Sequence, residues 1–269
     1  MRLRVADVTP SPPGASPPNM QTSSRVLSEL APRGFLRAGI NVSNFLLVTG
    51  HDAAGNPVGV APDMARAIAE RLGVGVRLVP FPTPGELSDR VGDDVWDVGL
   101  IGAEPQRAQH IAFSAAYVEI AATYLVGPNS TFRSAEEVDR PGVRIASTAR
   151  TAYDLWLERN IKNAELVRAS SVDGAYDDFV SMKLDALAGL RPQLITAAQK
   201  LPGSRILDGQ FSAVQQAIGT ARANEAGAAF IHEFVEAAKQ SGFVASLIEK
   251  HHVRGLTVAP PAALDPGSR

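Results

Sequence analysis

The sequence predicts an α/β protein made of two lobes. Strand patterns alternate with helix patterns along the chain, the alternation occurs in two successive blocks, and 269 residues suit two domains of medium size. Strands that alternate with helices at this spacing form parallel sheets with helices on both faces. Because open α/β sheets bind ligands at the carboxyl ends of their strands, we expect a ligand cleft between the lobes.

The first block contains the clearest helix. It opens at Pro62 and Asp63 and ends at Gly73, because apolar residues between them recur at positions i, i+3, i+4 and i+8. A strand at 35–40 precedes this helix. A strand at 74–78, a short helix at 86–91 and a strand at 95–101 that is buried on both faces follow it.

The second block repeats the scheme. Its apolar runs and amphipathic stretches predict five strands and five helices. The strands are 142–147, 165–169, 184–189, 205–207 and 214–220, and the helices are 151–160, 172–182, 192–200, 225–240 and 243–249.

The two ends of the chain differ from the blocks in composition. Residues 1–23 carry five prolines and are predicted to be a disordered leader, and residues 256–269 a disordered tail. Arg2 and Arg4 offer a basic start, but no apolar segment follows to make a secretory signal. The most apolar run, 111–126, is interrupted by polar residues, so we expect no membrane span.

Composition and motifs exclude several function classes. With 26 Lys and Arg against 28 Asp and Glu, the net charge of −2 argues against nucleic-acid binding. The absence of cysteine excludes disulfides, Cys-ligated metal centres and a thiol nucleophile. The five histidines show no metal-ligand spacing, and Gly-x-Ser-x-Gly, phosphate-loop and Gly-x-Gly-x-x-Gly motifs are missing. We therefore expect no metal, no cofactor and no catalytic residue.

Several short stretches then follow one another in a recognisable order over residues 24–252. They are 35–40 (FLRAGI), 55–69, 71–74, 96–100 (WDVGL), 105–107 (PQR), 111–117 (IAFSAAY), 139–146, 184–188 and 241–243. In these stretches the chain resembles the family 3 solute-binding proteins, the type II periplasmic receptors of polar amino acid ABC transporters.

The resemblance implies a fold and a function. Lobe 1 would comprise residues 24–122 plus 213–255, lobe 2 residues 123–212, and two crossover strands would form a hinge. A monomer would capture an amino acid or a related carboxylate between closing lobes and deliver it to an ABC-transporter permease. The family is periplasmic; since the sequence as written shows no signal, a cytoplasmic location is the alternative.

Arg107 lies where the family's Pro-x-Arg arginine receives the ligand carboxylate. A guanidinium fork makes paired, charge-assisted hydrogen bonds to a carboxylate and stays charged when buried. The alternative is a surface arginine on a helix that starts at Pro105. The backbone amides of loop 99–104, Gly102 among them, are expected near the anion, although this loop is shorter than the family's and lacks its Thr-x-Thr spacing.

Thr151 follows a strand and opens a helix, where a hydroxyl and free N–H groups can bind an anion. A helix cap without ligand is the alternative. Arg150 stands where many relatives have glycine. It either points outward or adds a second cation to the cleft, and the second case would favour acidic or dicarboxylate ligands.

One family feature is missing. The aspartate that receives the ligand's ammonium follows the strand that matches 184–188, and here that place reads Gly189-Leu190-Arg191. Either Glu104 or Glu119 replaces it, or the ligand has no ammonium group. Arg191 is itself a candidate ligand contact.

Aromatic walls are expected from Phe45, which follows the first strand, and Tyr117, which starts the crossover. Phe45 could equally be a core residue. Gln215, beside the returning hinge strand, is a further candidate contact.

Two other functions remain open. One is a lyase on the same scaffold, like the cyclohexadienyl dehydratases that resemble these receptors, with Glu104 or Glu119 as a buried acid. The other is a cytoplasmic receptor that senses a metabolite or passes it to a partner.

Overall fold

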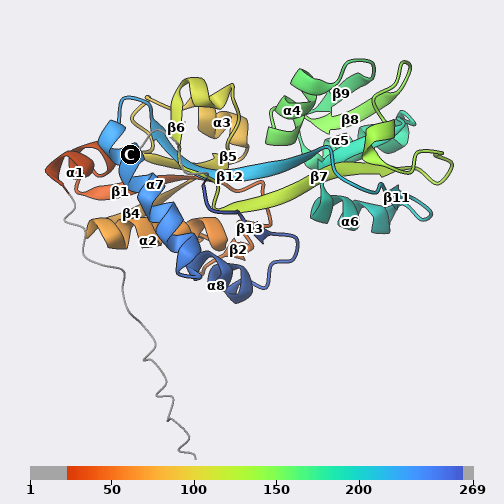
Figure 1. Ribbon diagram of the computed structural model, residues 1–269. Coiled ribbons are helices and arrows are strands. Elements are labelled where there is room, and N and C mark those ends of the chain that lie inside the picture. The colour runs from red at the N-terminus through yellow and green to blue at the C-terminus, as the bar shows by residue number, and fades with distance from the viewer. Residues whose placement is uncertain (1–22, 263–269) are drawn as a thin grey trace, which may run out of the picture.

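The structure is a computed structural model that describes residues 23–262, and one curled sheet runs through both of its lobes. The strand order is β4-β1-β5-β12-β7-β10-β8-β9. These strands are β1 (Phe35–Asn41), β4 (Gly75–Phe81), β5 (Val98–Gly102), β7 (Val118–Val126), β8 (Arg144–Thr148), β9 (Glu165–Ala169), β10 (Ala186–Leu190) and β12 (Ser212–Ala221). Figure 1 shows a lobe at either end of β7 and β12, which confirms the predicted two-lobed α/β fold.

Lobe 1 is built on β1, which pairs in parallel with β4 on one side and β5 on the other. Its helices are α1 (Ser24–Leu30), α2 (Val60–Leu72), α3 (Pro84–Asp89), α7 (Glu225–Gln240) and α8 (Phe243–Lys250). The apolar stripe of α2 is buried, as its spacing predicts, and the helix ends at Gly73, whose positive φ of 73° favours glycine. α2 begins at Val60, two residues before the predicted start.

A buried ion pair anchors the start of β5 to β1. Asp97 Oδ1 accepts from Arg37 Nη2 at 2.7 Å, and Asp97 Oδ2 accepts from the Arg37 backbone N–H at 2.8 Å. Both side chains are almost fully buried, and this pairing raises the pKa of Arg37 above its usual range. Asp97, the one charged residue in an apolar stretch, therefore serves the fold.

Lobe 2 is built on β8, which lies in parallel between β10 and β9. Its helices are α4 (Ala152–Asn160), α5 (Val172–Ser181) and α6 (Arg191–Lys200). Buried apolar residues of α4 and α5 pack against this sheet in two clusters separate from the main core of lobe 1.

The connection between the lobes is a pair of antiparallel strands. β7 carries the chain into lobe 2, β12 brings it back, and their register runs from Ser212 opposite Ala122 to Gln216 opposite Val118. The predicted lobe boundaries fall inside β7 and at the first residues of β12. Smaller elements are β2 (Gly50–His51), β3 (Pro57–Val58), β6 (Ile111–Phe113), β11 (Arg205–Ile206) and the 3-10 helices η1 (Arg107–Gln109) and η2 (Ala135–Glu137).

The two chain ends differ from expectation where the structure describes them. Of the predicted leader, only Ser23 lies within the described residues. The predicted tail is wrong at its start, because β13 (Thr257–Val258) pairs with β7 and the N–H of the buried Ala259 donates to the Tyr117 carbonyl at 3.1 Å. The prolines at 260 and 261 come after this short edge strand, so they remove no donor from it.

None of the helices between residues 23 and 262 has both the length and the apolar character needed to cross a bilayer. The longest is α7, with 16 residues. Its buried face includes Phe230, Ile231 and Val235, which belong to the core of lobe 1.

Candidate functional site

The two lobes touch where the end of β5 meets the start of α4. A Cβ added to Gly102 would lie 2.8 Å from the Cβ of Ala152, closer than real Cβ atoms approach. The absence of a side chain at Gly102 therefore lets lobe 1 and lobe 2 come into direct contact.

Charged and polar side chains join the lobes around this contact. Asp89 of α3 accepts hydrogen bonds from both terminal nitrogens of Arg150: Nη1 donates to Oδ2 at 2.9 Å and Nη2 to Oδ1 at 2.5 Å. Arg159 of α4 pairs with Glu104 at 2.5 Å, and Gln106 donates to Glu158 at 3.4 Å. Asp89 and Arg159 are absent from the sequence-based candidates, because no local pattern indicates a pairing between residues this far apart.

Arg107 is held at the same junction by backbone oxygens of both lobes. Its Nη1 donates to the Gly102 carbonyl at 2.6 Å and its Nη2 to the Arg150 carbonyl at 2.8 Å. The residue is 5% exposed, so the alternative of a surface arginine is wrong. Burial, with the nearby Arg150 charge, lowers the pKa of Arg107 to about 10, which leaves it protonated at neutral pH. Within residues 23–262 no carboxylate forms an ion pair with this guanidinium.

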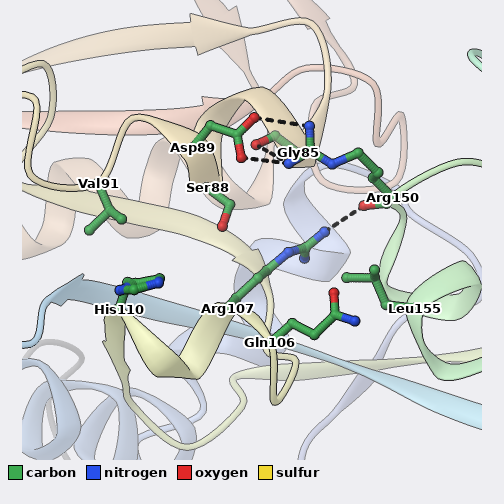
Figure 2. Close-up of a pocket in the computed structure, with 9 residues that line it drawn as sticks. All are labelled: Gly85, Ser88, Asp89, Val91, Gln106, Arg107, His110, Arg150 and Leu155. Atoms are coloured by element: carbon green, nitrogen blue, oxygen red, sulfur yellow. Dashed lines mark hydrogen bonds and ion pairs between the residues drawn. The ribbon is translucent and has the colours of Figure 1, made fainter. Parts of the chain in front are cut away.

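Arg107 and Arg150 line one cavity of about 450 Å³ (Figure 2). The remaining lining residues are Gly85, Ser88, Asp89, Val91, Gln106, His110 and Leu155. Figure 2 shows the Arg107 side chain extending toward the Arg150 carbonyl, with the Arg150 guanidinium beside Asp89. We call this the two-arginine cavity; its volume suits a small organic ligand.

A second cavity of about 260 Å³ shares no lining residue with the first. Phe45 reaches it from lobe 1, and at 46% exposure this side chain is not part of the core. Lobe 2 contributes Thr148, Tyr153 and Gln193, whose buried Oε1 finds no hydrogen-bond partner in the part of the chain that the structure describes. This cavity therefore combines an aromatic wall with a polar group able to accept a hydrogen bond.

Glu104 lies at the lobe contact, two residues after the end of β5. Burial raises the pKa of its carboxyl, while the positive charges of Arg159 and Arg107 oppose the rise. Of the two acids singled out from the sequence, Glu104 is the buried one, and Arg159 already pairs with it.

The prediction that Tyr117 forms an aromatic wall of the ligand site is wrong. Its side chain is 0% exposed and packs in the core of lobe 1, which raises the pKa of its hydroxyl above the usual range. Glu119 and Gln215 sit opposite each other on the hinge strands, where Gln215 Nε2 donates to Glu119 Oε1 at 2.9 Å. Neither residue lines either cavity.

The remaining candidates make contacts within lobe 2. Thr151 caps α4: its hydroxyl accepts from the Asp154 N–H at 3.2 Å and donates to the Thr148 carbonyl at 2.9 Å. Arg191 donates to the Gly209 carbonyl and lines neither cavity. Leu190, beside it, is buried in an apolar cluster.

Gly102→Ala is expected to hold the lobes apart. The added methyl group would collide with Ala152, and overpacking of this kind costs about 1–3 kcal/mol. We expect a larger radius of gyration by small-angle X-ray scattering and about tenfold weaker ligand binding. Gly127→Ala is the matched control, since a Cβ there meets nothing within 4 Å; equal effects of the two variants would contradict the prediction.

Comparisons with known proteins agree with this architecture. The model of the bacterial extracellular solute-binding proteins, family 3, matches residues 36–254. A mutant of ArgBP from T. maritima superposes with a TM-score of 0.68 at 24% identity, covering 85% of this chain and 100% of that one. The ancestral amino acid-binding protein AncCDT-1, a precursor of cyclohexadienyl dehydratase, gives 0.67 at 22% identity, covering 83% and 98%.

Two further relatives have different functions in their names: one is a transporter binding component and the other an enzyme. A binding component of an ABC transporter from Wolinella succinogenes, complexed with lysine, gives a TM-score of 0.67 at 20% identity, covering 81% of this chain and 95% of that one. Cyclohexadienyl dehydratase of Pseudomonas aeruginosa is 24% identical over 209 residues, which are 72% of this chain and 74% of that protein. At these identities the solved structures establish the shared two-lobed fold.

Proposed function

This chain belongs to the family 3 bacterial extracellular solute-binding proteins, and from that premise we propose that it captures an amino acid or a related small carboxylate between its lobes for ABC-transporter uptake. The observation that carries the proposal is the buried Arg107. It is a protonated guanidinium that lines a cavity at the lobe contact, and among the described residues its hydrogen-bond partners are neutral backbone oxygens only. A ligand carboxylate would supply the missing negative charge.

Ligand capture would work through lobe closure. A ligand shifts the protein toward the closed form only through contacts that it makes there and not in the open form. Arg107 extends from lobe 1 and already hydrogen-bonds a carbonyl of lobe 2. A carboxylate at this guanidinium would therefore lie at the junction of the two lobes, with groups of lobe 2 beside it.

The uptake role implies a membrane permease as partner and a location outside the cytoplasmic membrane. Two solved neighbours, a substrate-binding protein of an amino acid ABC transporter and a binding component of an ABC transporter, support this part of the proposal. A cytoplasmic receptor is the alternative, and a periplasmic pool in fractionated native cells would exclude it.

The proposal is tested by a thermal-shift screen of amino acids, dicarboxylates and aromatic acids, followed by calorimetric titration of each ligand found. A ligand at 100 times its dissociation constant raises the free energy of unfolding by about 2.7 kcal/mol. A carboxylate that stabilises the protein while its amide or ester does not is the expected result. No stabilisation by any acid in the screen would refute the proposal.

A lyase activity is the second candidate, because one relative is a cyclohexadienyl dehydratase and Glu104 is a buried carboxyl with a raised pKa. Such an acid could protonate a leaving group. Its pairing with Arg159, which opposes protonation, favours the binding role instead.

Turnover separates the two candidates. The protein would be incubated with a cyclohexadienyl acid such as prephenate, and an aromatic product followed by ultraviolet absorbance. We expect no product. If product forms and its formation is lost in the Glu104→Gln variant, the protein is a lyase and the proposed binding role is refuted.

A further inference from the structure

We propose that the physiological ligand carries two carboxylates and that Asp89 occupies the site of the second one when no ligand is bound. This inference rests on the proposed function and specifies the ligand class of the same site. Its basis is the juxtaposition of Arg107, Arg150 and Asp89 in the two-arginine cavity.

The cavity presents two cations, one from each lobe. Arg107 comes from lobe 1 and Arg150 from lobe 2, and both line the same space of about 450 Å³. Two guanidinium groups that line one cavity repel each other, and each is matched to a carboxylate: Arg107 uses two of its five N–H donors on backbone carbonyls and keeps the others for a ligand. One carboxylate can satisfy one fork, so two carboxylates satisfy the pair.

Asp89 already binds Arg150 in the geometry that a ligand carboxylate would adopt. Its two oxygens each accept a hydrogen bond from a terminal nitrogen of Arg150, at 2.9 and 2.5 Å. A Cβ on Gly85 would lie 2.9 Å from the Arg150 guanidinium carbon, so the missing side chain at Gly85 leaves room for this arrangement. The Arg150 guanidinium is thus positioned to bind a carboxylate through two parallel hydrogen bonds.

The Asp89 carboxylate is weakly held and can be displaced. Both partners of the pair are 55% exposed, and exposed ion pairs contribute little stability. Asp89 is also the last residue of α3, where the helix dipole disfavours a negative charge. Once displaced, its carboxylate can be solvated by water at small cost.

The backbone of Arg150, in contrast, stays in place without Asp89. Its backbone N–H donates to Asp154 Oδ2 at 2.9 Å, and Asp154 is itself buried and paired with Arg168. The residue holds a positive φ of 62°, which that bond and the adjacent cap of α4 maintain. With this backbone fixed and the side chain also donating to the Gly85 carbonyl at 3.5 Å, the guanidinium remains in the cavity when its carboxylate partner changes.

Two matched ligand pairs test the proposal in calorimetric titrations of the full chain: glutamate with glutamine, and succinate with succinamate. Within each pair only the second carboxylate differs, and the second pair lacks an ammonium group. We expect the acid of at least one pair to bind about tenfold more tightly than its amide. Arg150→Gln is expected to abolish that preference.

Asp89→Asn removes the internal competitor. We expect it to tighten binding of the acid about threefold to fivefold and to leave the amide unchanged. Asp93→Asn is the matched control, because Asp93 forms an equally exposed pair with Arg90 inside lobe 1, with an exposed fraction of 54%.

Each other outcome overturns the inference in a recognisable way. Equal binding of acid and amide refutes the second carboxylate and leaves the proposed function intact. Weaker binding of both ligands by Asp89→Asn would make the Asp89–Arg150 pair a latch of the closed lobes and not a stand-in. Absence of binding by these four ligands and by the whole screen refutes the proposed function together with the inference.

Discussion

Arg107→Ala is expected to abolish the stabilisation of this protein by carboxylate ligands. Truncating one partner of a buried, hydrogen-bonded charge pair costs about 2–5 kcal/mol, which corresponds to a loss of affinity of about 30-fold or more. The ligand-free protein should keep its melting temperature or gain slightly, because the substitution removes a buried charge whose hydrogen-bond partners within residues 23–262 are all neutral. Calorimetric titration and thermal shift with saturating ligand measure both effects.

Two further variants define the role of Arg107. Arg107→Lys keeps the charge without the fork, and we expect intermediate affinity. Arg222→Ala is the control, since Arg222 also donates to a backbone carbonyl, that of Ala108, but from an exposed position. Full ligand-induced stabilisation of the Arg107→Ala variant would remove Arg107 from the site.

Asp97→Ala is expected to cause the largest loss of stability. It would leave Arg37 buried without its main partner, and breaking a buried ion pair in this way costs about 3–5 kcal/mol. For a chain of this size the melting temperature should fall by about 6–20 °C. Differential scanning calorimetry of the ligand-free protein measures the change.

The neighbouring Asp94 provides the comparison. It also pairs with Arg37, but its side chain is 62% exposed, so Asp94→Asn should cost less than about 1 kcal/mol. Similar losses in the two variants would show that burial of the Arg37 pair is not what stabilises β1 against β5.

Much of the fold could be predicted because each lobe alternates strands and helices with strong local patterns. The strand 165–169 and the helix 225–240 have the predicted bounds. β13 could not be predicted, because two residues before prolines carry no periodicity and are ordered only by pairing with β7. Tertiary pairing, not local preference, determines such elements.

The site was less accessible to sequence reasoning. Arg107 could be singled out from the Pro-x-Arg motif and Arg150 from a position where many relatives have glycine, and both line the same cavity. Tyr117 was misplaced because an aromatic residue at the start of a hinge strand can face either the cleft or the core, and one residue of register decides which. Asp89 carried no signal, since its partner belongs to the other lobe.

The antiparallel pairing of β7 with β12 also has a consequence for the order of folding. Gln216 must reach Gly102 before the sheet of lobe 1 is complete, and all of lobe 2 lies between them in the chain. Closing so long a loop is entropically costly and slow, whereas lobe 2 is continuous and its contacts are more local. Lobe 1 begins to emerge from the ribosome first, but its sheet is completed only after lobe 2 has been synthesised. If lobe 2 folds early, the loop that must close to bring β12 to β5 becomes shorter.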